Sequence, residues 1–126
     1  MKDAFEKLVK SVYQLRSENG CPWDKAQTLQ SFKNFLLNEA REVVQAIERE
    51  DHENLKEELG DLLWNILLIT RIAEEENLFQ LKDVLDNATE KLVRRHPWVW
   101  GEETLPANAE EALAIWNKNK AREKQK

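Results

Sequence analysis

The chain has 126 residues, which suits one domain with its own hydrophobic core. Its net charge of −5 at pH 7 disfavours binding to nucleic-acid polymers. The single cysteine excludes a disulfide within the chain, and no apolar run is long enough to span a membrane. Gly and Pro are scarce, at three each. We therefore expect a cytoplasmic, all-α protein without a membrane partner.

Hydrophobic periodicity divides the chain into five helices within one domain, residues 1–126. The expected helices span about 3–17, 28–50, 53–76, 80–95 and 108–124. Asn19-Gly20 ends the first helix, Pro97 follows the fourth, and Asn108 is expected to cap the fifth. Residues 21–24 and the segment after Pro97 are expected to be loops. The predicted architecture is an antiparallel four-helix bundle core with an extra C-terminal helix.

Two central helices carry most of the predicted core. On the helix at 28–50, five apolar residues are expected to face inward: Leu29, Phe32, Leu36, Val43 and Ile47. The next helix is apolar nearly all round over residues 62–69, which predicts a central place in the bundle or a subunit interface. Asn65 interrupts this run. It either supports a nearby ligand group or fixes the pairing of helices in an interface.

Two pairs of carboxylates stand out on these same helices. Each pair is spaced i,i+3, so both acids lie on one helical face, and the stripes that hold them are otherwise apolar. The four residues are Glu39, Glu42, Glu58 and Asp61. Glu42 lies about ten residues before the turn near residue 52, and Asp61 lies about nine after it. At ~1.5 Å per residue both are about 14 Å from the turn, which predicts that the acids converge.

Converging carboxylates repel one another and need a positive partner. No cluster of His or Cys accompanies them, so oxygen ligands alone predict Mg²⁺, Mn²⁺ or Ca²⁺. A cation held in this way suits hydrolysis of a phosphoanhydride. The other interpretation is that acidic pairs arise by chance on solvated helix faces of an acidic protein.

Four motifs of the chain resemble the MazG family of all-α nucleoside triphosphate pyrophosphohydrolases. Residues 38–42 (NEARE) and 58–61 (ELGD) resemble its E-E-x-x-E and E-x-x-D motifs. Residues 19–24 (NGCPWD) contain its G-C-P-W-D segment, and 91–100 (KLVRRHPWVW) resembles K-x-x-R-R-H-P-H-V-F. The similarity extends over most of the chain, from about residue 16 to 101.

The resemblance implies an enzyme that cleaves NTPs or dNTPs between the α and β phosphates, giving a monophosphate and pyrophosphate. Such an enzyme would clear unwanted nucleotides from the pool. The acidic residues that the resemblance implies as Mg²⁺ ligands and catalytic groups, with Mn²⁺ as a substitute, are Glu39, Glu42, Glu58 and Asp61. Related enzymes self-associate, so a dimer or tetramer is expected.

The resemblance also implies residues that bind the substrate. Lys91 and Arg95 match basic residues that contact the phosphates, and their spacing of four places them on one helical face. Trp116 and Lys120 resemble a late W-x-x-x-K pair, in which an indole stacks on the base and an ammonium meets a phosphate. The alternative is that Trp116 is a core anchor with a lysine stem lying beside it.

The chain also departs from the family pattern. Asn38 replaces the first Glu of E-E-x-x-E, and Trp98 and Trp100 replace the second His and the Phe of H-P-H-V-F. The matching motifs resemble the amino-terminal half of two-domain members, a half that in some of them contributes little or no activity. An alternative function is therefore a weakly active or non-catalytic nucleotide-binding or oligomerisation module.

Overall fold

A computed structural model of the chain describes residues 1–124, and the regular elements among these residues are all helices. They are α1 (Lys2–Leu15), α2 (Pro22–Lys25), α3 (Leu29–Glu48), α4 (His52–Glu75), α5 (Leu81–Arg94), α6 (Pro97–Trp100) and α7 (Ala109–Lys124). The all-α prediction is confirmed. Each of the five predicted helices is present, with its ends within two residues of the predicted ones. Among the described residues, no helix is both long and apolar enough to cross a bilayer.

Two single-turn helices occupy segments that the sequence predicted as loops. Both α2 and α6 begin at a proline, which fixes φ at a helical value and lacks the N–H that a first helical turn leaves unpaired. A helix of four residues has no apolar period, which explains why the periodicity did not indicate either one.

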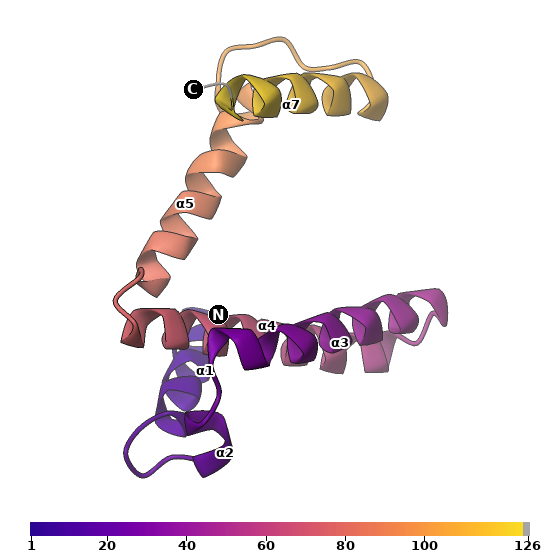
Figure 1. The fold of residues 1–126 in the computed structure, drawn as a ribbon. Coiled ribbons are helices and arrows are strands. Elements are labelled where there is room, and N and C mark those ends of the chain that lie inside the picture. Colours follow the sequence, from indigo (N-terminus) through magenta and orange to yellow (C-terminus); the bar gives the residue numbers. More distant parts are fainter. Residues whose placement is uncertain (125–126) are drawn as a thin grey trace. The chain divides into compact units, whose positions relative to one another are not determined.

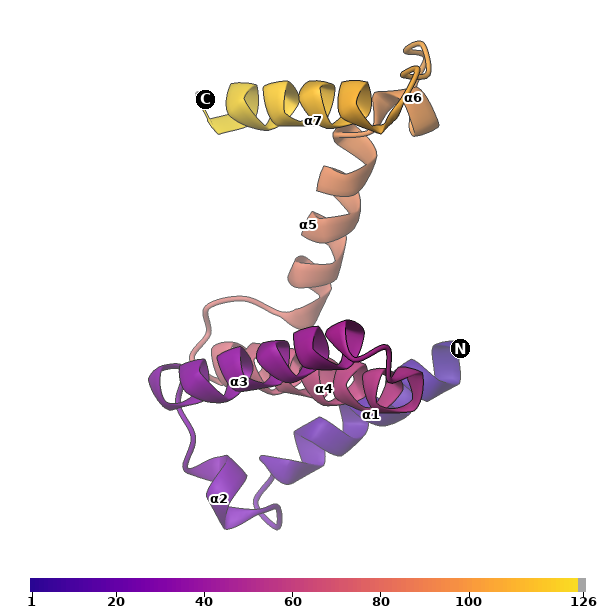
Figure 2. The same ribbon diagram turned by 90° about the vertical axis from the view of Figure 1, so that its right-hand side faces the viewer.

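The described chain divides into two compact units, residues 1–81 and the part of 82–126 that the structure describes. The first unit holds α1 to α4, and the second holds α6, α7 and nearly all of α5. In the first unit α3 and α4 lie side by side and run antiparallel, and α1 packs against α4 (Figures 1 and 2). That the whole chain forms one domain remains a prediction.

The core of the first unit forms where α1, α3 and α4 meet. Val12, Phe32, Leu67 and Leu68 are buried together there, at 3% exposure or less. Burying each such side chain contributes about 1.5–3 kcal/mol. Phe32 and Val43 are buried as predicted, but the inward placement of Ile47 is wrong, because this side chain is 57% exposed.

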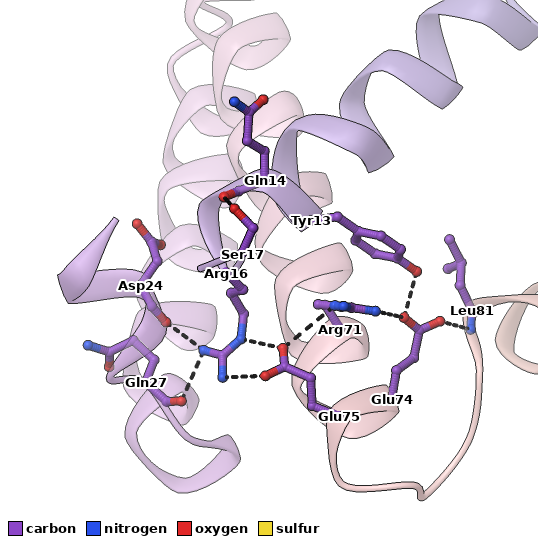
Figure 3. Close-up of polar contacts among 10 residues, drawn as sticks. All are labelled: Tyr13, Gln14, Arg16, Ser17, Asp24, Gln27, Arg71, Glu74, Glu75 and Leu81. Atoms are coloured by element: carbon purple, nitrogen blue, oxygen red, sulfur yellow. Dashed lines mark hydrogen bonds and ion pairs between the residues drawn. The ribbon is translucent and has the colours of Figure 1, made fainter. Parts of the chain in front are cut away.

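Hydrogen bonds from Arg16 connect the loop after α1 to the end of α4 (Figure 3). Its guanidinium Nη1 donates to the carbonyl oxygens of Asp24 (2.5 Å) and Gln27 (3.1 Å), and its Nε donates to Glu75 Oε2 (2.7 Å). The loop also folds back so tightly that a Cβ at Gly20 would lie 2.2 Å from the carbonyl oxygen of Leu15. A side chain at Gly20 would therefore force the loop to open.

A second polar cluster lies beside this one (Figure 3). Buried Glu74 accepts hydrogen bonds from the Tyr13 hydroxyl (2.6 Å), from Arg71 (3.3 Å) and from the backbone N–H of Leu81 (2.8 Å). Burial alone would raise the pKa of Glu74, but these hydrogen bonds outweigh it and lower the pKa. Burial and the neighbouring Glu74 raise the pKa of Tyr13 to about 12. The cluster joins α1 to the segment after α4.

Replacing Arg16 should destabilise the first unit much more than replacing an exposed basic residue. The Arg16 side chain is 8% exposed, so Arg16→Ala removes a buried guanidinium that donates to Glu75 and to two loop carbonyls. We expect a loss of about 2–4 kcal/mol in the free energy of unfolding, measured by urea denaturation.

The matched control is Lys56→Ala, because Lys56 forms an ion pair with Glu53 in which both side chains are at least 75% exposed. This change should cost less than about 0.5–1 kcal/mol. Equal losses for the two variants would contradict the anchoring role of Arg16.

Candidate functional site

Capped helix ends and a short turn fix the register of α3 against α4. The Thr28 hydroxyl accepts from the backbone N–H of Ser31, and the Ser31 hydroxyl returns the bond in a capping box at the start of α3. The Asp51 carboxylate caps α4 by accepting from the backbone N–H of Asn54. Between the helices Glu50 adopts a positive φ of 54°, which closes the turn. This register determines which carboxylates meet.

Three of the four predicted carboxylates converge between α3 and α4. One oxygen each from Glu39, Glu58 and Asp61 lies within 4.8 Å of the other two. Oε2 of Glu39 and Oε2 of Glu58 are buried and have no hydrogen-bond donor among the described residues. A buried carboxylate oxygen without a donor is costly. The geometry therefore leaves oxygen atoms that only a proton, a water or a cation could satisfy.

The electrostatics of this cluster oppose full ionisation. Burial, followed by the charges of Glu42 and Asp61, raises the pKa of Glu39. The pKa of Glu58 rises from 4.5 to about 7, through hydrogen bonding with the Glu42 carboxyl, burial, and the charges of Glu42, Asp61 and Glu39. Two carboxylates have no donor to offer each other, so such a bond needs a proton held between them. Without a cation, the cluster therefore retains protons near neutrality.

Glu42 lies at the edge of the cluster and contacts the residue that departs from the family motif. The side-chain amide of Asn38 donates to Glu42 Oε1 over 3.4 Å, a long hydrogen bond. Glu42 also influences the pKa of both Glu39 and Glu58, so it lies close to them. The structure thus brings all four predicted acids into one neighbourhood, with Glu42 outside the tightest group of three.

The donor set fits a hard divalent cation. Oxygens on opposite sides of Mg²⁺ are about 4.2 Å apart, and those around Ca²⁺ are about 4.6–5.2 Å apart. One oxygen from each of the three carboxylates lies within 4.8 Å of the other two. Neighbouring oxygens around Mg²⁺ are only about 3 Å apart, so side-chain rotations would have to draw the three together to hold the smaller ion. Four acids and no His or Cys form a donor set typical of Mg²⁺, Mn²⁺ or Ca²⁺.

Asn65 is buried one turn after Asp61. It is 3% exposed, and its side-chain amide donates to the backbone carbonyl of Asp61 (2.7 Å). The contact is therefore with the helix backbone that carries Asp61 rather than with its carboxylate.

The predicted basic and aromatic residues lie in the second unit. Two cations contact the Trp116 ring: the Arg95 guanidinium lies 5.5 Å and the Lys120 ammonium 5.0 Å from the ring centroid. Lys91, Arg95 and Trp116 line one hollow, together with Ala88, Leu92 and His96. Trp116 lines a second, more aromatic hollow with His96 and Trp98. Trp116 is therefore half-buried and borders both hollows.

Two residues of this unit were missed by the sequence reasoning. Arg94 Nε donates to Glu123 Oε1 (2.7 Å), while Arg95 donates to Glu123 Oε2 from Nε (3.0 Å) and Nη2 (2.8 Å). These bonds lower the pKa of Glu123 to about 2. A separation of 28 or 29 residues between two helices leaves no local pattern that would have indicated this contact.

His96 follows the end of α5 and caps the helix with its side chain. Its Nδ1 lies 2.5 Å from the carbonyl oxygen of Leu92, one of the last carbonyls of α5, which the helix itself leaves unpaired. Its ring also contacts Trp98 edge-on, with the ring centroids 5.4 Å apart.

Comparisons with known proteins agree with these features. Residues 27–100 match the model of the MazG nucleotide pyrophosphohydrolase domain. The chain is 43% identical to the nucleoside triphosphate pyrophosphohydrolase/pyrophosphatase MazG of Thermotoga maritima over 105 residues, which cover 81% of this chain and 41% of that protein. It is 40% identical to the nucleoside triphosphate pyrophosphohydrolase of Escherichia coli K12, over 95% of this chain and 46% of that protein.

A solved structure has the same fold. The crystal structure of a mazG-related protein from Thermotoga maritima aligns with a TM-score of 0.75 and 32% identity, covering 92% of this chain and 98% of that one. By contrast, the chain spans less than half of the length of the two pyrophosphohydrolases.

The raised pKa of Glu58 predicts how the metal-free protein responds to pH. The folded carboxyl keeps its proton up to a pH of about 7, whereas the unfolded one loses it near 4.5. The contribution of Glu58 to stability is therefore fully present below pH 4.5 and is lost as the pH rises to 7. In EDTA, we expect the Tm followed by circular dichroism to fall between pH 4.5 and 7.

Glu58→Gln should flatten this fall, because the amide does not ionise. Adding Mg²⁺ should raise the Tm of the unmodified chain at pH 7.5 more than that of the variant. The pKa of Glu123 is lowered to about 2, so its contribution to stability is lost only as the pH falls below 4.5, which is outside this range. Identical pH profiles for the two proteins would contradict the shared-proton interpretation.

Proposed function

Because the chain belongs to the MazG nucleotide pyrophosphohydrolase domain family, we propose that it hydrolyses nucleoside triphosphates to monophosphates and pyrophosphate. The observation that carries the proposal is the carboxylate cluster between α3 and α4, with two buried oxygens that no described donor satisfies. The names of the relatives from Thermotoga maritima and Escherichia coli support the reaction class. Nucleotide clearance in the cytoplasm is the corresponding cellular role.

We propose that the cluster holds Mg²⁺, with Mn²⁺ as a substitute. Glu39, Glu58 and Asp61 would supply the nearest oxygens, and Glu42 would join them by a rotation that breaks its long bond to Asn38. When bound, the cation supplies neutralisation of phosphate charge and polarisation of a water. The carboxylates hold it and are themselves relieved of mutual repulsion, which allows them to ionise at neutral pH.

In the second unit, Lys91 and Arg95 are proposed to bind the phosphates and Trp116 the base. Lys91 and Arg95 line one hollow with Trp116, so cationic groups and an indole face border the same space. Lys120 adds a second ammonium beside that ring. Guanidinium and ammonium groups suit phosphate oxygens, and an indole face suits a base.

The alternative function is nucleotide binding with weak or no turnover. The observation that favours it is Asn38, which supplies no charge and instead donates to Glu42. Glu42 is also not one of the three carboxylates in the tightest group. A cluster with fewer engaged carboxylates would bind a cation more weakly and stabilise less charge in the transition state.

A triphosphate panel separates the two functions. With Mg²⁺, the purified chain should release pyrophosphate and monophosphate, and EDTA should abolish the release. Asp61→Asn and Glu42→Gln should each lower kcat/KM by about 100-fold or more, because each removes charge from the cation site. Nucleotide binding without turnover at every Mg²⁺ and Mn²⁺ concentration would support the alternative instead.

The matched control is Glu57→Gln, which removes the same charge from an exposed residue next to Glu58. Its activity should stay within about twofold of that of the unmodified chain, since the substitution changes the electrostatic potential at the cluster only from a distance. A loss as large as that of Asp61→Asn would show that net charge, not the cluster, sets the activity. Orthophosphate and a diphosphate as products would contradict the assigned bond.

We also propose that the chain self-associates through α4. Leu59, Leu63 and Ile66 follow the i, i+4, i+7 spacing of one helical stripe and are 49%, 40% and 42% exposed. An apolar stripe of this kind on a single chain is typical of an interface. A second copy of the chain presents the same stripe and can cover it symmetrically.

Leu63→Glu should therefore weaken self-association. Sedimentation equilibrium should give the unmodified chain at least twice the monomer mass of 14.9 kDa and the variant a mass close to the monomer. Leu105→Glu is the control, because Leu105 is 72% exposed in a loop of the other unit. A monomeric unmodified chain, or an unchanged mass for Leu63→Glu, would contradict the proposal.

A further inference from the structure

Two adjacent arginines at the end of α5 both form ion pairs with a single carboxylate on α7. Arg94 takes one oxygen of Glu123 and Arg95 takes the other, over 2.7–3.0 Å. Arg95 is the less exposed of the two, with 16% of its side chain accessible, against 46% for Arg94. Glu90 also pairs with Arg94 (3.0 Å), but of the two acids only Glu123 joins both guanidinium groups.

The same two guanidinium groups have the geometry that binds a phosphoryl group. Their planar forks direct N–H donors at paired oxygens, a geometry that matches carboxylate and phosphate alike. Arg95 also borders the hollow shared with Lys91 and Trp116, so the arginine pair adjoins a space that a ligand can enter. Glu123 is 26% exposed and therefore reachable by a competing anion.

We propose that Arg94 and Arg95 form a phosphate subsite in which the Glu123 carboxylate is the resting occupant, displaced when a polyphosphate binds. The ligand class is the di- or triphosphate part of a nucleotide, so the assignment rests on the proposed function. A polyphosphate carries several charges against one on the carboxylate, and both cannot occupy the same donors without strong repulsion. Binding therefore releases Glu123 and breaks the ion pairs that Glu123 forms between α7 and the end of α5.

A purely structural ion pair predicts the opposite response to mutation. If Glu123 only held α7 against α5, its removal would loosen the unit and weaken anion binding. If it occupies a subsite, its removal frees Arg95 and strengthens anion binding. The two interpretations thus differ in the sign of one affinity change.

The test is calorimetric titration with inorganic tripolyphosphate, in EDTA, of the full chain and two variants. Glu123→Gln and Glu90→Gln each remove one negative charge beside Arg94, but only the first removes the carboxylate that Arg95 contacts. We expect Glu123→Gln to bind about tenfold more tightly than the unmodified chain, and Glu90→Gln less than about twofold more tightly. Equal affinities in the two variants, or no binding by Glu123→Gln, would overturn the proposal.

Three further measurements test whether the affinity change is specific to the arginine pair. In NMR spectra at pH 6.5, tripolyphosphate should shift the Nε–H signals of both Arg94 and Arg95, and unchanged signals would overturn the assignment. Glu123→Asp keeps the charge, so its affinity should stay nearer that of the unmodified chain. Circular dichroism should show equal helix content in all variants, and an affinity gain that accompanied a loss of helix would count against the subsite.

These measurements do not depend on turnover. An inactive chain whose Glu123→Gln variant binds tripolyphosphate more tightly would contradict the proposed hydrolysis and leave the subsite standing. An active chain with no difference among the variants would contradict the subsite alone.

Discussion

Repulsion among the carboxylates between α3 and α4 is the constraint on which the rest of the site depends. Glu39, Glu58 and Asp61 bring oxygens within 4.8 Å of one another, and two of these side chains have buried oxygens without a donor. Without a metal, the raised pKa values of Glu39 and Glu58 indicate that the cluster retains protons, which reduces this repulsion. A divalent cation would neutralise the repulsion among the carboxylates at neutral pH. A site of this kind therefore favours binding of such a cation.

The first unit holds these helices in place through contacts far from the acids. Phe32 and Leu68 pack α3 against α4, and the N-caps Thr28 and Asp51 fix the residues at which the two helices begin. Arg16 ties the loop before α3 to the last turn of α4, so both ends of the helix pair are held. Rigid elements with fixed register are what allow acids from two helices to meet.

Local patterns in the sequence were sufficient for the helices and for the convergence of the acids. Apolar periodicity indicates a helix. Where a short turn joins two antiparallel helices, residues equally far from the turn along the chain lie at equal heights. Contacts between distant segments had no such signature, which is why the Tyr13–Glu74 bond and the Arg95–Glu123 pair were missed. Ile47 was wrongly placed inward because its position fits the period of the apolar stripe, whereas its side chain is 57% exposed in the structure.

Cation binding by the cluster is the central claim, and titration of metal-free protein with Mn²⁺, followed by electron paramagnetic resonance, tests it most directly. We expect saturable binding to the unmodified chain and to Glu57→Gln, and loss of binding in Glu58→Gln and Asp61→Asn. Competition by Mg²⁺ should release the Mn²⁺. Equal Mn²⁺ binding by all four proteins would show that the converging carboxylates are not the cation site.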